Sequence, residues 1–248
     1  MEWYSEEMSE SLAARLREVT EALRPFGEPR RVADARSDKS SNLKFLAIRV
    51  PAIRSRIKEG FPFYAGSPQA ILKTWNYIWA CSPYYEVKSA PLMYYQLQGI
   101  SVEPAIFDTL KSWIEIVDNW GHCDALSSIY SNVCHQEVDL AYPTFLRLTQ
   151  HPSPWARRAA VVSLVHYTGK NAIYLDFAAM VAIIDRLLGD QDRYVAKAIA
   201  WVLRETAHRS PRSVAGYVRA KRDAMSPVVE RHIRSELKHY VTFTEEGR

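Results

Sequence analysis

The sequence of 248 residues is poor in cysteine and glycine and has no long hydrophobic run. Its three cysteines, Cys81, Cys123 and Cys134, are an odd number without CxxC spacing, which predicts reduced thiols rather than a disulfide framework. No run of about 18 apolar residues occurs, and the first ten residues are acidic and polar, so neither a membrane span nor a signal peptide is expected. We therefore expect a cytoplasmic protein that does not contact membranes.

The alternation of apolar and polar residues that marks β-strands is also missing. Apolar residues recur instead at helical spacing, and a Ser-Pro pair precedes four of these runs, at 67–68, 153–154, 210–211 and 226–227. Serine suits the N-cap and proline the first helical position, so these pairs predict helix starts. The expected helices cover roughly 5–24, 51–59, 68–81, 86–98, 103–117, 138–150, 154–168, 175–188, 191–208, 211–223 and 227–240.

An all-α chain of short helices and tight turns favours antiparallel pairs stacked as an α-solenoid, whose curvature gives a concave face. Only segment 26–50 is expected to be irregular. We expect one helical-repeat domain over 1–240, a frayed tail over 241–248 and a monomeric protein.

Charge is distributed unevenly along the chain. Residues 1–150 hold 16 basic and 18 acidic side chains, and residues 151–248 hold 16 and 10, so the two parts carry −2 and +6. A second basic stretch runs from Arg24 to Lys58. Such clusters suit a polyanion such as DNA, although a merely solvated basic surface has the same composition.

Two stretches of the basic part place cations beside aromatic or apolar residues. Within 191–207, Tyr194, Lys197, Trp201 and Arg204 share one helix face, opposite an apolar stripe. Such a face also fits the edge of a core with basic neighbours. Within 153–167, Arg158 shares its face with valines and needs an anionic partner, either a carboxylate such as Asp124 or a phosphate.

The stretch 118–126, "DNWGHCDAL", places Trp120 and Asp124 four residues apart. If the segment is helical, the two side chains are neighbours on one face. A pair of this kind can simply stabilise a helix turn. It also offers an aromatic face and a carboxylate to one cation.

Three stretches carry a family resemblance: "NWGHCDAL", "PWARRAAVVSLVHY" and "YVAKAIAWVLRE", in this order and followed by basic helices. Together they resemble the AlkD-type DNA alkylation repair family. The members of this family are alkylpurine DNA glycosylases built from HEAT-like helical repeats. The resemblance is strongest over 105–240. It implies a concave, electropositive face that binds duplex DNA containing alkylated bases. It implies a site formed by Trp120, Asp124, Arg158 and Trp201, with Arg157, Tyr194, Lys197 and Arg204 contacting DNA.

Two features depart from the family pattern. Gly121 and His122 follow the first tryptophan where bulkier or more polar residues are expected, and segment 33–42 offers no aromatic side chain.

The chemistry implied is hydrolysis of an N-glycosidic bond without a cofactor or metal. N-alkylation puts a positive charge on the purine, and departure of the base leaves oxocarbenium-like charge on the deoxyribose. A fixed carboxylate stabilises that charge and orients water, while tryptophan faces attract the cation and exclude solvent.

Other functions fit parts of the same sequence. A zinc site from His122-Cys123 and Cys134-His135 is disfavoured because adjacent helical residues point about 100° apart. Cys123 as a nucleophile lacks a supporting motif. A non-catalytic DNA-binding paralogue and a helical-repeat scaffold for protein partners stay open as alternatives to the glycosylase.

Overall fold

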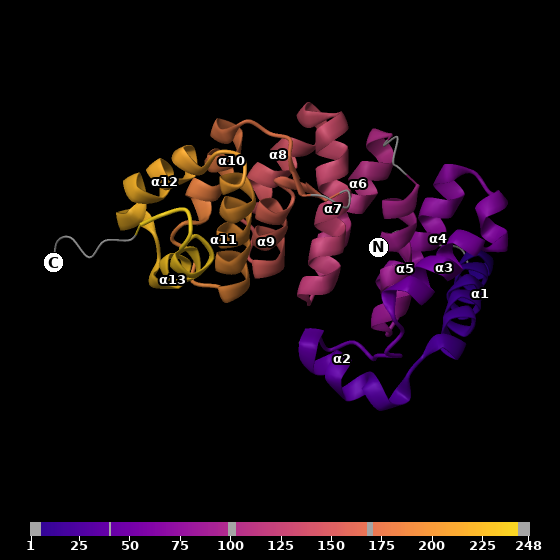
Figure 1. Ribbon diagram of the computed structural model, residues 1–248. Coiled ribbons are helices and arrows are strands. Elements are labelled where there is room, and N and C mark those ends of the chain that lie inside the picture. The colour runs from indigo at the N-terminus through magenta and orange to yellow at the C-terminus, as the bar shows by residue number, and fades with distance from the viewer. Residues whose placement is uncertain (1–5, 40, 99–102, 168–170, 243–248) are drawn as a thin grey trace. The chain divides into compact units, whose positions relative to one another are not determined.

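The computed structural model describes residues 6–39, 41–98, 103–167 and 171–242, and in these ranges the chain forms thirteen α-helices and one short hairpin (Figure 1). The predicted all-α class is confirmed. The chain packs as two compact units, Met1–Ala125 and Leu126–Arg248, and the division falls inside α7. The single domain expected over 1–240 stays a prediction.

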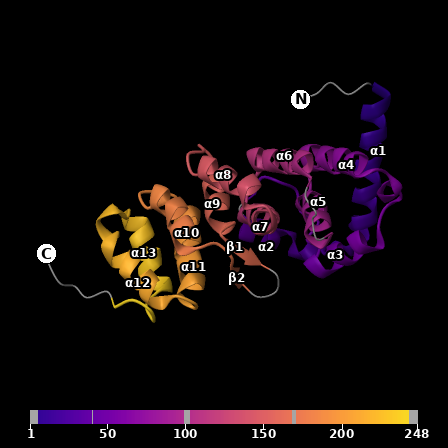
Figure 2. The same cartoon turned by 90° about the horizontal axis from the view of Figure 1, so that it is seen from above.

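The first unit is built around buried tryptophans. Its helices are α1 (Glu6–Leu23), α2 (Val32–Lys39), α3 (Val50–Glu59), α4 (Pro68–Cys81), α5 (Tyr85–Leu97), α6 (Pro104–Ser112) and the start of α7 (Trp120–Gln136). Helix α1 packs against α4 and α5, and α3 packs against α5 (Figure 2). Trp75, Trp79 and Trp113 fill the space between the helices and are at most 2% exposed.

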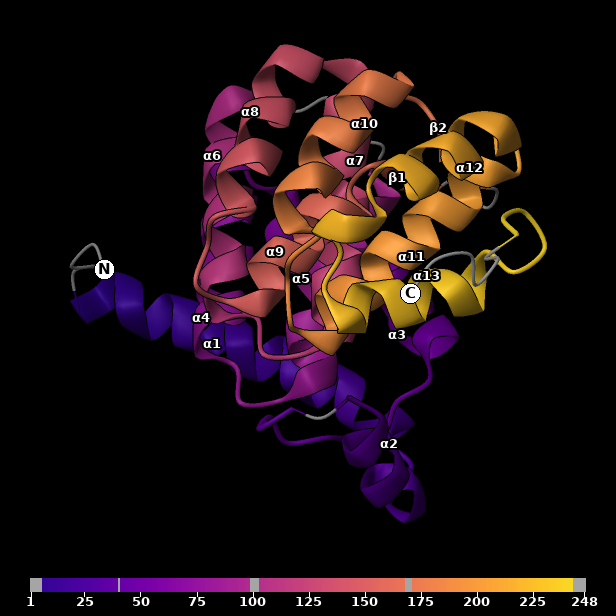
Figure 3. The same cartoon turned by 90° about the vertical axis from the view of Figure 1, so that its left-hand side faces the viewer.

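Helix α11 is the centre of the second unit. The helices of this unit after α7 are α8 (Val138–Leu148), α9 (Pro154–Val162), α10 (Phe177–Ile184), α11 (Arg193–Ala207), α12 (Pro211–Ala220) and α13 (Pro227–Glu236). Helix α11 packs against α9, α12 and α13 (Figure 3). Its apolar stripe, which includes Val195, Ile199 and Val202, is completely buried.

The Ser-Pro pairs mark helix starts, as predicted. Helices α4, α9, α12 and α13 all begin at the proline of such a pair. The serine side chain accepts a hydrogen bond from the backbone at two of them: Ser67 from Ala70 N and Ser226 from Val229 N. At the other two starts the proline alone marks the boundary, because its missing N–H costs nothing in the first turn.

Segment 26–50 is more regular than predicted. It contains the 3₁₀ turn Pro29–Arg31, which leads directly into α2, while 41–49 has no helix. The expectation was wrong for α2 because this helix, with sequence VADARSDK, has no apolar stripe and so gives no periodic signal.

The helix expected over 154–168 ends at Val162, and a hairpin follows. Strand β1 (Val165–Tyr167) pairs antiparallel with β2 (Asn171–Ile173), with Val165 opposite Ile173. The Tyr174 hydroxyl donates to the carbonyl oxygen of Ser163 at 2.6 Å, which satisfies an acceptor just after α9. Strands of three residues are too short to show alternation, which is why the sequence did not predict them.

The remaining predictions from the sequence concern the C-terminal tail, the cysteines and membrane spans. Of the tail expected over 241–248, residues 243–248 lie outside the described residues, and Val241 is only 4% exposed. Cys81, Cys123 and Cys134 all lie in the described ranges, and none of them forms a disulfide. None of the helices in the described ranges combines the length and the apolar character needed to cross a membrane.

The centre of the second unit should be sensitive to a loss of volume. Ile199→Ala removes a fully buried side chain on α11 and should lower the free energy of unfolding by about 2–5 kcal/mol. Lys197→Ala on the exposed face of the same helix should change it by less than about 0.5 kcal/mol. Urea unfolding measures both, and equal effects of the two variants would contradict this assignment of the core.

Candidate functional site

The first turn of α7 is fixed by the side chain of Asn119. Its Oδ1 accepts a hydrogen bond from the backbone N–H of His122 at 2.8 Å, which is the geometry of an N-cap. Its Nδ2 donates to Asp118 Oδ1 at 2.9 Å and to His122 Nδ1 at 3.0 Å. Asn119 is completely buried, and its two bonds to His122 are shielded from water.

Asp118 connects the start of α7 to the segment before α3. Its carboxylate accepts hydrogen bonds from Ser41 Oγ at 2.8 Å and from Asn42 N at 2.9 Å. Burial raises the pKa of Asp118, but the hydrogen bonds from Asn119, Asn42 and Ser41 outweigh it, so the net pKa is below the ordinary value. The carboxylate is therefore held ionised as a structural bridge.

His122 is packed into the first unit and uses both ring nitrogens. Nδ1 accepts from Asn119, and Nε2 lies 3.1 Å from the carbonyl oxygen of Tyr85 and 3.0 Å from Ser89 Oγ, which assigns the proton to Nε2. The imidazole stacks on the ring of Tyr85 at 4.2 Å. Across the part of the chain that the structure describes, no three His, Cys, Asp or Glu side chains gather as metal ligands.

Gly121 is explained by a close approach. A Cβ atom at this position would overlap the hydroxyl oxygen of Tyr85, which lies against the first turn of α7. Tyr85 thus contacts both of the residues, Gly121 and His122, that depart from the family pattern in the sequence.

Trp120 and Asp124 lie one turn apart at the start of α7, since the segment is helical over Trp120–Gln136. Both side chains are half-buried. The two residues that the sequence singled out therefore occupy neighbouring positions on one face of α7.

In the second unit, Arg158 is anchored to the start of α11. Its Nη1 donates to the carbonyl oxygen of Tyr194 at 2.7 Å. The Tyr194 ring packs against the ring of Trp155, with 4.7 Å between centroids, and the Arg193 guanidinium lies over its plane. Arg158 and Tyr194 are thus joined, whereas the meeting of Trp120 and Asp124 with Arg158 and Trp201 stays a prediction.

Two of the predicted DNA contacts have carboxylate partners within the protein. Arg157 forms an ion pair with Asp190 at 2.6 Å and also donates to two backbone carbonyl oxygens. Arg204 is paired with Glu205 and Glu236. Apart from Glu205, these partners lie far away in the sequence, so the compensation of this charge is not visible in the sequence pattern.

Lys197 and Trp201 are placed differently. They lie one turn apart on α11, Lys197 exposed and Trp201 half-buried. Among the described residues, neither side chain has a hydrogen bond, ion pair or ring contact. This face of α11 therefore offers a cation and an aromatic ring to a ligand.

A cationic group surrounds His232 on α13. Burial lowers the pKa of His232, and the nearby charges of Arg231, Lys197 and Arg193 lower it further, while Glu236 acts in the opposite direction. His232 is therefore neutral at pH 7, and the arginines and Lys197 leave a local excess of positive charge that attracts anions. This group is not visible in the sequence, because its members lie on α11 and α13, which are separate segments of the chain.

Comparisons with known proteins add the family context. The sequence model of the family described as "DNA alkylation repair enzyme" matches residues 19–235. The fold is similar to a predicted DNA alkylation repair enzyme from Enterococcus faecalis, with a TM-score of 0.70 and 15% identity over 89% of this chain and 98% of that chain. It is also similar to AlkD2 from Streptococcus mutans, with a TM-score of 0.59 and 17% identity over 86% of this chain and 98% of that chain. No curated protein matches the chain.

The Asp118 bridge should make the fold sensitive to acid. Since the pKa of Asp118 is lower in the folded chain than in the unfolded chain, where it is about 3.9, its bonds contribute stability above that pH. This contribution is lost as the pH falls through the folded pKa. Urea unfolding between about pH 6 and pH 3 should show the wild type and Asp118→Asn converging as the pH falls.

The exposed Asp139 on α8 is the matched control, and Asp139→Asn should follow the wild type over the same range. If the curves for Asp118→Asn and the wild type stay parallel down to about pH 3, Asp118 does not stabilise the fold as an ionised bridge.

Proposed function

Because the chain belongs to the DNA alkylation repair enzyme family, we propose that it is a monofunctional glycosylase that excises cationic N-alkylated purines, of the 3-methyladenine and 7-methylguanine type, from duplex DNA. The bond between C1′ and the purine nitrogen breaks, and its electron pair leaves with the base. Water adds to C1′ and loses a proton. The step needs no cofactor, because alkylation has already made the purine a cationic leaving group. We further propose that the protein acts as a monomer in the cytoplasm.

The observation that carries this proposal is the position of Trp120 and Asp124 on a fixed helix start. The buried Asn119 cap and the Asp118 bridge hold the first turn of α7 before any ligand arrives. A carboxylate held in place stabilises developing positive charge without reorganisation at the moment of reaction. Asp124 is proposed to face the deoxyribose and orient the water, and Trp120 to cover the cationic nucleotide.

Binding of the DNA backbone is assigned mainly to the second unit. Lys197, Arg193 and Arg231 supply positive charge around His232, and Trp201 offers its ring on the same face of α11 as Lys197. Arg158, oriented by the Tyr194 carbonyl oxygen, is proposed to hold a backbone phosphate or the Asp124 carboxylate. Contacts of this kind position the duplex and do not read its sequence.

The proposed role of Asp124 predicts a loss in the chemical step alone. Asp124→Asn keeps the size of the side chain but removes its charge, so excision should slow by on the order of a hundredfold while DNA affinity is nearly unchanged. Single-turnover release of base from N-methylated duplex DNA measures the rate. Arg158→Ala should instead weaken binding and excision together, because a phosphate contact exists before the bond breaks.

Asp108→Asn is the matched control, since Asp108 is an exposed carboxylate of the same unit with a surface ion pair to Lys111. It should excise at the wild-type rate. Excision by Asp124→Asn at that same rate would make Asp124 structural. A wild type that binds DNA but releases no base would favour a non-catalytic DNA-binding protein.

Binding should be independent of DNA sequence and sensitive to salt. Each phosphate contact releases counterions, so affinity for a random duplex should fall steeply between about 50 and 200 mM salt. Lys197→Gln should reduce the slope of log affinity against log salt by about one. Arg157→Gln should reduce it less, because Arg157 is already paired with Asp190. A flat salt response would favour a scaffold for protein partners.

A further inference from the structure

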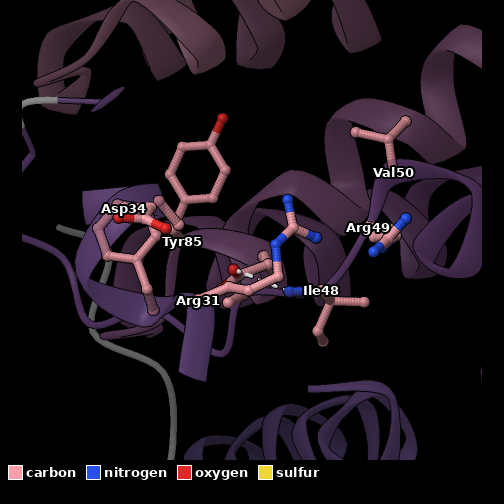
Figure 4. Close-up of a pocket in the computed structure, with 10 residues that line it drawn as sticks. Arg31, Asp34, Ile48, Arg49, Val50 and Tyr85 are labelled. Atoms are coloured by element: carbon pink, nitrogen blue, oxygen red, sulfur yellow. Dashed lines mark hydrogen bonds between the residues drawn. The ribbon is translucent and has the colours of Figure 1, made fainter. Parts of the chain in front are cut away.

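A pocket of about 480 Å³ lies in the first unit, between α2, the segment before α3 and the start of α5 (Figure 4). This volume lies within the range of small-ligand sites, roughly 300–1,000 Å³. The lining is mixed: an apolar wall that includes Phe45, Ile48 and Val50, and the side chains of Arg31, Arg49 and Asp34. None of these residues was predicted from the sequence to form a site.

The segment that forms the pocket wall is held in one conformation. The carboxylate of Glu86, which is 2% exposed, accepts hydrogen bonds from Leu46 N at 2.9 Å and Ile48 N at 3.3 Å. Ala47 between them has a φ of 57°, a conformation that is unfavourable for a non-glycine residue. The buried Glu86 carboxylate therefore holds the backbone around Ala47 in an unfavourable conformation. This conformation sets the positions of the following residues, Arg49 and Val50, in the pocket wall.

Two cations share one carboxylate beside this pocket. Glu28 Oε1 accepts from Arg49 Nε at 2.8 Å and from Arg31 Nη1 at 3.4 Å. The Arg49 side chain is 65% exposed, that of Arg31 is 51% exposed, and that of Glu28 is 37% exposed. Ion pairs at this exposure contribute little to stability, so another anion can replace Glu28 at small cost. The two arginines carry one more charge than Glu28, and the carboxylates of Asp34 and Glu86 also line the pocket.

The pocket shares a wall with the candidate catalytic turn. Tyr85 lines the pocket, and its ring is stacked between Phe45 at 5.0 Å and His122 at 4.2 Å. Its hydroxyl lies against Gly121, next to Trp120. A strand bound at the first turn of α7 is therefore separated from the pocket by one aromatic side chain.

We propose that this pocket takes one nucleotide of the DNA strand next to the one under attack, with its phosphate bound by Arg31 and Arg49 in place of Glu28. The deoxyribose and base then pack on the apolar wall. Figure 4 shows Asp34 and Arg49 on opposite sides of the pocket, so the phosphate belongs at the Arg49 side, away from the Asp34 carboxylate. The proposal rests on the proposed function in that it takes duplex DNA as the ligand.

The test is binding of an unmodified random duplex, measured by fluorescence anisotropy at several salt concentrations. Arg49→Gln should weaken binding about three- to tenfold and reduce the salt slope by about one, because a phosphate contact is lost. Glu28→Gln should tighten binding about two- to fivefold, because the phosphate no longer has to displace a carboxylate.

Matched variants separate the pocket from general charge effects. Arg54→Gln removes an exposed arginine of α3 that does not line the pocket, and Glu21→Gln releases Arg24 from a comparable exposed pair. Both should change affinity less than twofold. Ala35→Phe fills the pocket from α2 without a change of charge, and in this background Arg49→Gln should lose most of its effect.

The proposal is wrong if each pocket variant changes DNA affinity only as much as its control, that is, Glu28→Gln as much as Glu21→Gln and Arg49→Gln as much as Arg54→Gln. It is also wrong if the wild type does not bind DNA. Base release from methylated duplex is measured separately. If the pocket variants shift binding as expected but no base is released, the glycosylase function fails and the pocket assignment holds. If base is released and the pocket variants match their controls, only the pocket assignment is wrong.

Discussion

The candidate site depends on the buried side chain of Asn119. Its carbonyl oxygen caps α7, and its amide nitrogen donates to Asp118 and His122, so one residue orients both partners. Asp118 then holds the segment before α3, and His122 packs against Tyr85. Through these contacts the first turn of α7, the pocket wall and the loop from Ser41 form one connected network, and a network that is fully hydrogen-bonded is rigid.

Much of this arrangement is predictable from the sequence, but the network is not. The Ser-Pro pairs predict four helix starts, and the spacing of Trp120 and Asp124 predicts that they are neighbours on a helix. Asn119 stands directly before Trp120 and is a preferred N-cap residue, so its capping role was accessible from the sequence as well. The bond from Ser41 to Asp118 and the contact of His122 with Tyr85 were not, because they join segments that are far apart in the chain. Helix α2 and the hairpin were not predicted from the sequence, because a polar helix and three-residue strands lack a hydrophobic period.

The structure also changes which cations are assigned to DNA. Counting basic residues gives the same weight to Arg157 and Lys197, yet Arg157 is paired with Asp190, while Lys197 is exposed and has no ion pair with any described residue. The carboxylate partner is set by helix packing and is invisible in composition. Arg31 and Arg49 are intermediate in how far their charge is compensated, since both are paired with the same carboxylate, that of Glu28. The attraction for a polyanion thus depends on how each charge is compensated more than on the total.

The central claim is that this helical framework breaks the N-glycosidic bond of a purine that carries positive charge. It is tested most directly by incubating the purified wild-type protein with N-methylated duplex DNA and separating the free bases by chromatography. The account predicts that 3-methyladenine or 7-methylguanine is released while adenine and guanine stay attached, because only the alkylated purines leave as neutral bases from a cationic state. Tight binding of the methylated duplex without release of any base would contradict it.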